Sequence, residues 1–266
     1  MKKRIAFLIG FFCFFISKTE AQTSTVYFDK NWDTCPKRKA YYTRVLEAKR
    51  DSIIETDYYP DGKIHSTTIY RIDSPEIKNG YHKYYAETGL LFKEGNYKNG
   101  KEDGLWKCYR ASGALWFEEE MKNGVNNGYL KAYYPNGALK VKERYENGNL
   151  WEGKRYGHDG RDTTFYKFKE MPEFVGGSQA MYEYLTEHIV YPPQAFKKKF
   201  EGKVTIKFAV DTDGSLIEVH VARPVYRDLD KEALRVVSAM PKWKPGTLDD
   251  KPIKIYFQVP IKFVLQ

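Results

Sequence analysis

The sequence predicts an all-β array of hairpin repeats, followed by an α+β carboxyl-terminal module of two helices on a three-stranded antiparallel sheet. Glycines that recur every 24 residues, within turn motifs between alternating strands, predict the array. After Asp162 the recurrence stops, and a helix, two strands, a helix and a last strand follow in order. A chain of 266 residues is long enough for two ordinary domains.

Residues 1–21 have the order of an export signal. Lys2, Lys3 and Arg4 precede an apolar run over residues 5–16, and Ala21 offers a small residue for cleavage before Gln22. A membrane span needs about 20 apolar residues, which this run does not reach. We therefore expect a cleaved signal peptide and a periplasmic protein. An uncleaved signal would instead leave the protein attached to the inner membrane.

The net charge of +9 is spread along the chain, with one dense basic stretch. A solvated basic face and a surface for anionic envelope polymers are both open interpretations of that stretch. No nucleic-acid-binding motif accompanies the charge, so we expect no nucleic-acid partner. The stretch consists of Lys37, Arg38, Lys39, Arg44, Lys49 and Arg50.

Catalytic and metal-binding motifs are not found in the sequence. The five histidines are scattered, and none lies beside a serine or cysteine nucleophile in a local motif. No Cys-x-x-Cys spacing is present, so we expect no metal, no cofactor and no enzymatic activity. Cys35 and Cys108 can form a disulfide in an oxidising compartment or remain two thiols, and the sequence leaves both open.

Residues 22–57 are predicted to be a cap or linker with β-structure, in which residues 41–48 and 52–57 form a hairpin. The repeats then occupy residues 58–162. Asn-Gly and Asp-Gly pairs favour tight turns, because both residues tolerate positive φ. Four positions recur at the same interval: Gly80, Gly104 and Gly128; Gly89, Gly113 and Gly137; Tyr85, Tyr109 and Tyr133; and Asn99-Gly100, Asn123-Gly124 and Asn147-Gly148.

This pattern resembles MORN-type repeats, and more closely the repeat variant of YwqK-like antitoxin proteins. The resemblance implies an architecture and says little about function. We expect most aromatic side chains of the array to fill its core. Stacking on the sugar rings of peptidoglycan is the alternative.

The module occupies residues 170–266. Ser178 is a candidate N-cap of a first helix, and Pro193 can begin a short second one. Asp228 or Asp230 can cap a later helix, which Pro241 ends. The predicted apolar faces of the strands are Val204, Ile206, Phe208 and Val210; then, after a turn at Asp213-Gly214, Ile217, Val219 and Val221; and finally Ile253, Ile255, Phe257, Val259, Ile261 and Phe263.

The module resembles the TonB carboxyl-terminal domain family over about 95 residues. The residues that carry the resemblance are Tyr191-Pro192, Ala195, Gly202-Lys203-Val204, Asp213-Gly214, Leu229-Asp230, Ala233, Trp243-Lys244-Pro245 and Val259-Pro260-Ile261. The resemblance implies binding to the TonB box of an outer-membrane receptor. It also implies a motor of the ExbB/ExbD type as a second partner. The expectation of a motor partner is the weaker of the two, because the first apolar run is short and hairpin repeats stand where members of the family have a proline-rich linker.

Pro260 indicates where a peptide would bind. Proline has no N–H to donate, so the last strand belongs at a sheet edge, where an extended peptide can add as a further strand. We expect the docking edge at Lys254, Ile255, Tyr256, Phe257 and Gln258, and the resemblance places Tyr191 and Pro192 near the receptor. The predicted function is a TonB-like transport protein. The alternative is an envelope scaffolding protein that transduces no energy.

Overall fold

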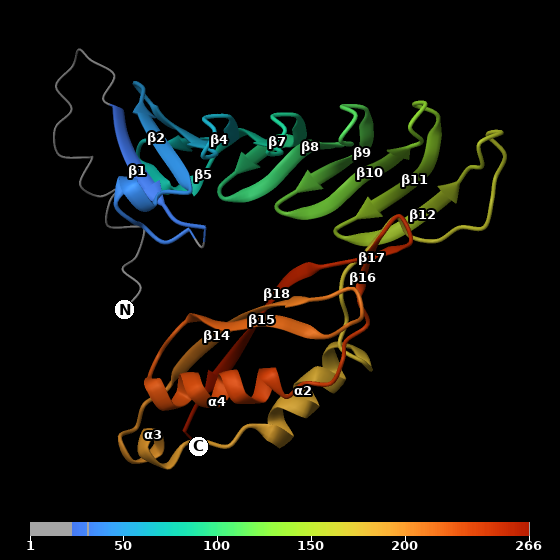
Figure 1. Ribbon diagram of the computed structural model, residues 1–266. Helices are drawn as coiled ribbons and strands as arrows, with labels where there is room; N and C mark the ends of the chain where they lie inside the picture. The colour runs from blue at the N-terminus through green and yellow to red at the C-terminus, as the bar shows by residue number, and fades with distance from the viewer. Residues whose placement is uncertain (1–22, 31, 266) are drawn as a thin grey trace. The chain divides into compact units, whose positions relative to one another are not determined.

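The computed structural model describes residues 23–30 and 32–265, and the predicted export signal lies outside this range. The chain divides into two compact units, Met1–Phe165 and Tyr166–Gln266. The first contains the hairpins and the second the α+β module (Figure 1). Within the described residues, the helices are too short or too polar to cross a bilayer.

The first unit is built on one antiparallel sheet, in which 12 strands of the described residues pair. The spatial order is β1-β2-β3-β4-β6-β7-β8-β9-β10-β11-β12, and β5 pairs with β4 beside this path. The strands are β1 (Thr23–Phe28), β2 (Tyr42–Ala48), β3 (Ser52–Tyr58), β4 (Ile64–Arg71), β5 (Ser74–Lys78), β6 (Gly80–Tyr85), β7 (Leu91–Lys98), β8 (Lys101–Tyr109), β9 (Leu115–Lys122), β10 (Val125–Tyr133), β11 (Leu139–Glu146) and β12 (Asn149–Arg155).

Residues 22–57 were expected to be a cap or linker, and their strands belong to the same sheet as the repeats. β2 and β3 form the expected hairpin, with Thr43 opposite Tyr58. A 3-10 turn, η2 (Lys37–Lys39), lies between β1 and β2. The sheet therefore begins before the first recognisable repeat, where the sequence shows strand alternation but no glycine period.

The Asn-Gly turns have the predicted conformation. Asn99 has φ 51° and Gly100 φ 76°, and the equivalent pairs one and two repeats later are alike. A two-residue turn with positive φ at both residues has a backbone twist that matches the right-handed twist of the strands it joins. Successive repeats are therefore joined by the same short turn.

The centre of the array is filled by a position that recurs every 24 residues: His82, Trp106 and Leu130, each at most 1% exposed. Trp106 lies against Gly95, where an added Cβ would come within 2.2 Å of the indole ring. Only glycine fits opposite so large a side chain. The indole N–H donates to the Asn96 carbonyl at 3.1 Å, so this buried donor is satisfied. The expectation that most aromatic side chains fill the core is met only in part: Phe28, Trp106 and Phe117 are buried, most others are partly buried, and Trp151 is 71% exposed.

Deleting one whole repeat tests the regularity of the array. Removal of residues 89–112 joins Thr88 to Gly113 and recreates a turn of the same type, so we expect a cooperative thermal melt to survive. Removal of residues 89–100 deletes β7 alone, so the remaining strands lose their antiparallel order and register. Equal loss of melting cooperativity in both deletions would contradict a regular array.

The second unit has an antiparallel three-stranded sheet in the order β15-β14-β18. Its strands are β14 (Gly202–Val210), β15 (Leu216–Arg223) and β18 (Ile255–Phe263). Three helices occur within the described residues, where the overall prediction had two on the sheet: α2 (Gly177–His188), α3 (Pro193–Lys197) and α4 (Arg227–Ser238). A second small sheet, which the sequence did not predict, contains β13 (Lys169–Glu170), β16 (Gly246–Leu248) and β17 (Lys251–Ile253).

Aromatic rings join the sheet of this unit to the loop that follows α4. Trp243 is 4% exposed, and its ring centroid lies 5.3 Å from those of both Phe208 and Phe257. The backbone N–H of Trp243 donates to the Gly214 carbonyl at 2.8 Å, and a Cβ on Gly214 would come within 2.0 Å of the Trp243 carbonyl oxygen. The turn at Asp213-Gly214 is thus held against the residue that closes the core.

Three local predictions for this unit were wrong. Ser178 does not cap α2, because the helix already starts at Gly177 and the chain enters through Gly176 at φ 90°. No Asp side chain caps α4; Asp230 instead accepts a bond from the Val225 N–H at 2.8 Å. In β15 a bulge at Glu218, with φ 56°, interrupts the alternation, so Leu216 rather than Ile217 packs on the core with Val219 and Val221.

Candidate functional site

The edge of the carboxyl-terminal sheet is formed by β18, which among the described residues pairs only with β14. Pro260 lies opposite Thr205. In an antiparallel ladder, residues that face each other alternate between exchanging two hydrogen bonds and exchanging none. Proline cannot donate, so Pro260 occupies a position that exchanges none with β14. Pro260 thus fixes which residues of β18 bond to β14 and which do not. We call this alternation the phase of the strand.

The phase determines which backbone groups of β18 point away from the sheet. Residues with odd numbers bond to β14, whereas the N–H groups of Tyr256, Gln258 and Lys262 face outwards. Of the five residues expected at the docking edge, Ile255 and Phe257 therefore turn their backbone groups inwards. Lys254 lies between β17 and β18 rather than within the strand. The outward donors of the expected segment are Tyr256 and Gln258.

The side chain of Tyr256 is 50% exposed on the solvent face of the sheet and is held there by a polar cluster. Its hydroxyl donates to Glu218 at 2.8 Å, and Lys254 Nζ bonds to the same carboxylate at 3.0 Å. These two hydrogen bonds lower the pKa of Glu218. Lys207 Nζ lies 5.2 Å from the Tyr256 ring centroid. Tyr256 thus bridges the sheet from β18 to β15 and leaves its backbone free at the edge.

Tyr191 and Pro192 lie at the other end of β18. The Tyr191 ring packs edge-on against Phe263 with centroids 5.8 Å apart, and Pro192 immediately precedes α3. Phe263 is seven positions beyond Tyr256, which corresponds to about 23 Å along a strand. The structure therefore does not bring the two groups of predicted site residues together. A peptide that touched both would have to follow the whole strand.

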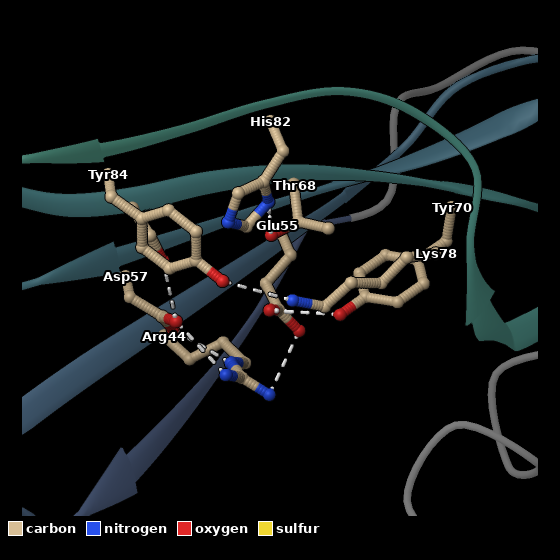
Figure 2. Close-up of polar contacts among 9 residues, drawn as sticks. Arg44, Glu55, Asp57, Thr68, Tyr70, Lys78, His82 and Tyr84 are labelled. Carbon is tan, nitrogen blue, oxygen red and sulfur yellow. Dashed lines mark hydrogen bonds and ion pairs between the residues drawn. The ribbon is translucent and has the colours of Figure 1, made fainter. Parts of the chain in front are cut away.

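A second polar cluster, which the sequence did not predict, lies within the array (Figure 2). Arg44 on β2 binds Asp57 on β3 through two hydrogen bonds of 2.8 and 3.0 Å. Its third nitrogen lies 2.9 Å from Glu55 on the same strand. Both acidic residues are buried, with side chains 6% (Glu55) and 3% (Asp57) exposed. One guanidinium therefore joins two buried acids on one face of the sheet.

The cluster continues across β4 and β6. The Tyr70 hydroxyl donates to Glu55 at 3.2 Å, and Thr68 Oγ1 lies 2.6 Å from His82 Nδ1. Burial raises the pKa of Glu55 to about 7, with a smaller contribution from Asp57, and Arg44 counteracts part of the rise. Burial lowers the pKa of His82 to about 3, and Lys78 and Lys93 add to this. His82 is therefore neutral at physiological pH.

These residues have a structural arrangement rather than a catalytic one, since each carboxylate is already bound by Arg44. The interpretation of the basic stretch as a solvated face does not hold for Arg44, whose side chain is 17% exposed and forms two ion pairs. A sequence signal did exist: Ile53, Glu55 and Asp57 alternate on one strand face. Cys35 and Cys108 are not joined by a disulfide. Over residues 23–30 and 32–265, no group of His, Cys, Asp or Glu is placed to hold a metal ion.

Replacing Glu55 by Gln tests the buried cluster. The folded protein binds the Glu55 proton more tightly than the unfolded chain, whose ordinary pKa is 4.5. The contribution of Glu55 to the free energy of unfolding therefore falls as pH rises from 4.5 to about 7, by about 3 kcal/mol. We expect Glu55→Gln to remove this slope in urea titrations at several pH values. Glu47→Gln, at a position of β2 whose side chain is 39% exposed, should leave the slope intact, and an unchanged slope in Glu55→Gln would contradict the assignment.

Comparisons with known proteins agree with both resemblances. Residues 187–265 match the family model of the Gram-negative bacterial TonB protein C-terminal, and residues 126–147 match that of the MORN repeat variant. Among solved structures, the solution structure of the Helicobacter pylori TonB carboxyl-terminal domain is similar at 20% identity, covering 33% of this chain and 79% of that one with a TM-score of 0.27. No curated protein matches the chain. The assignment of residues 187–265 rests on the family model.

Proposed function

From the match of residues 187–265 to the TonB carboxyl-terminal family, we propose that this protein captures an extended peptide of an outer-membrane receptor, its TonB box. The peptide adds to β18 as a further antiparallel strand. The role is binding rather than catalysis, in a protein exported to the periplasm. The observation that carries the proposal is the phase of β18, which turns the backbone of Tyr256 and Gln258 away from the sheet.

The energetics suit a reversible grip. Each added backbone hydrogen bond contributes about 0.5–1.5 kcal/mol net. Tyr256 and Gln258 each offer an N–H and a C=O, whereas Pro260 offers only a C=O. The ladder is therefore strongest over the first half of β18, where the sequence placed the docking segment. The cluster of Tyr256, Glu218 and Lys254 fixes the solvent face beside it.

Replacing Tyr256 by Pro tests this proposal. The substitution removes an outward donor and leaves the ladder to β14 intact, so we expect a folded protein that binds a TonB-box peptide about ten-fold more weakly. Tyr256→Ala retains the N–H and should have a smaller effect. Isothermal titration calorimetry measures the affinity, and circular dichroism confirms the fold.

Lys262→Pro is the matched control, because it removes an outward donor from the same edge beyond Pro260. A peptide that docks at residues 254–258 should bind this variant as the parent does. Equal affinity of the parent and a folded Tyr256→Pro variant would refute docking at residues 254–258. A loss only in Lys262→Pro would move the site to the end of the strand near Tyr191.

The second candidate function is an envelope scaffold that binds the same peptide without transducing energy. The observation that favours it is the array itself, since a continuous sheet of hairpins stands where the TonB family has a proline-rich linker. Coupling to an ExbB/ExbD-type motor requires a retained membrane segment. Mass spectrometry of the native protein decides between the two: a start at Gln22 supports the scaffold, and an intact first segment supports transduction.

A further inference from the structure

One end of the carboxyl-terminal module exposes large apolar side chains. Phe196 on α3 is 60% exposed, Val264 after β18 is 49% exposed, Val225 before α4 is 41% exposed, and Phe200 before β14 is 38% exposed. The other apolar residues of α3, β14 and α4 are mostly buried in the core. Folding of the module alone therefore leaves these four side chains uncovered.

Short contacts link the segments that carry these four side chains. Phe200 stacks on Tyr226 with ring centroids 4.0 Å apart, next to Val225 in the chain. Val225 lies against Gly202, which pairs with Phe263, the neighbour of Val264. Tyr191 joins Phe196 to Phe263 through edge-on contacts of 6.0 and 5.8 Å. We call this surface, with the cations around it, the basic apolar end.

Seven exposed cations surround the apolar side chains, and none of them forms an ion pair within the described part of the chain. They are Lys197, Lys198, Lys199, Lys203, Arg223, Arg227 and Lys262. The acids nearby are Glu201, Asp228 and Asp230, and seven minus three leaves a net charge of +4. Glu201 and Asp230 already accept backbone N–H groups of Leu265 and Val225.

Two of these cations oppose each other directly. Lys203 on β14 and Lys262 on β18 are register partners, at a position of the ladder that exchanges no hydrogen bonds. Side chains at such positions are the closest pairs in a sheet, and like charges there are destabilising. Each strand thus carries a cation where a neutral residue would favour folding. An anionic partner outside the chain would remove that repulsion.

We propose that the basic apolar end docks on an anionic phospholipid surface. The lysines and arginines would lie at the headgroups while Phe196 and its apolar neighbours enter the boundary of the acyl chains. The inference does not depend on peptide capture at β18. It gives the module a second contact, which would hold it beside the membrane in which its partner lies.

Two features favour a lipid surface over an acidic protein segment. Five of the seven cations are lysines, which act as mobile point charges, whereas paired recognition of carboxylates favours the planar fork of arginine. The apolar residues also project from a short helix and from loops, and Phe196 has most of its surface in water. Projecting phenylalanines among lysines match the interfacial faces of peripheral membrane proteins.

Sedimentation with lipid vesicles tests the proposal. We expect the full chain without residues 1–21 to bind vesicles of about 30 mol% phosphatidylglycerol in phosphatidylcholine, and to bind pure phosphatidylcholine vesicles far less. Raising the salt from about 0.05 to about 0.5 M should release it. Replacing Lys197, Lys198 and Lys199 by Gln should weaken binding about 100-fold. Phe196→Ser, at a position that is 60% exposed, should weaken it about ten-fold at unchanged charge, with circular dichroism confirming the fold.

The matched control replaces three exposed lysines of the array, Lys98, Lys101 and Lys122, by Gln and so changes the net charge equally. This control should keep parental binding. The proposal is overturned if the parent binds anionic vesicles no better than neutral ones, or if both triple variants lose binding to the same extent. It is also overturned if Phe196→Ser binds vesicles as the parent does, and if the triple lysine variant loses affinity for an acidic peptide but not for vesicles. TonB-box affinity, measured in parallel, should be unchanged in all of these variants.

Discussion

The missing N–H of Pro260 is the constraint on which the account of the carboxyl-terminal module depends. A strand in an antiparallel sheet can bond to β14 in either of two phases, and proline is compatible with only one. In that phase, the backbone groups of the odd-numbered residues of β18 bond to β14, and their side chains face the core. It leaves Tyr256 and Gln258 with exposed side chains and unpaired backbone groups. The docking edge is therefore a consequence of how the core is hydrogen bonded.

The array is held together by a different balance of forces. Its sheet has buried acids on separate strands, Glu55 on β3, Glu119 on β9 and Glu143 on β11. Each has a partner from an adjacent position: Arg44 and Tyr70 for Glu55, Asn126 for Glu119, and Tyr145 for Glu143. Such groups add little net stability, but leaving one of them unpaired would cost several kcal/mol, about 3–5. Glu55 and Glu119 have their partners on neighbouring strands, so a slip of register would separate them, and these pairs favour one alignment of the strands. Tyr145 lies on the same strand as Glu143 and does not report on register.

Much of this architecture is predictable because it rests on local chemistry. Asn-Gly turns, the 24-residue period and the alternation in β18 each follow from the conformational preferences of a few residues. The failures are places where tertiary contacts decide. The bulge at Glu218 is placed by pairing with β14, and the β16–β17 hairpin by contacts with β13. The partners of Arg44 come from another strand, which composition does not reveal. Tyr191 was expected near the receptor, and its packing on Phe263 puts it at the opposite end of β18 from Tyr256, which the sequence alone does not show.

The most direct measurement is amide hydrogen exchange by NMR, with and without a TonB-box peptide. In the free protein, the amides of Phe257, Val259 and Ile261 should exchange slowly because they bond to β14, whereas those of Tyr256 and Gln258 should exchange fast. Added peptide should slow Tyr256 and Gln258 selectively. Slow exchange of these two amides in the free protein would contradict the phase assigned to β18. Protection that appears on β15 instead would contradict its role as the docking edge.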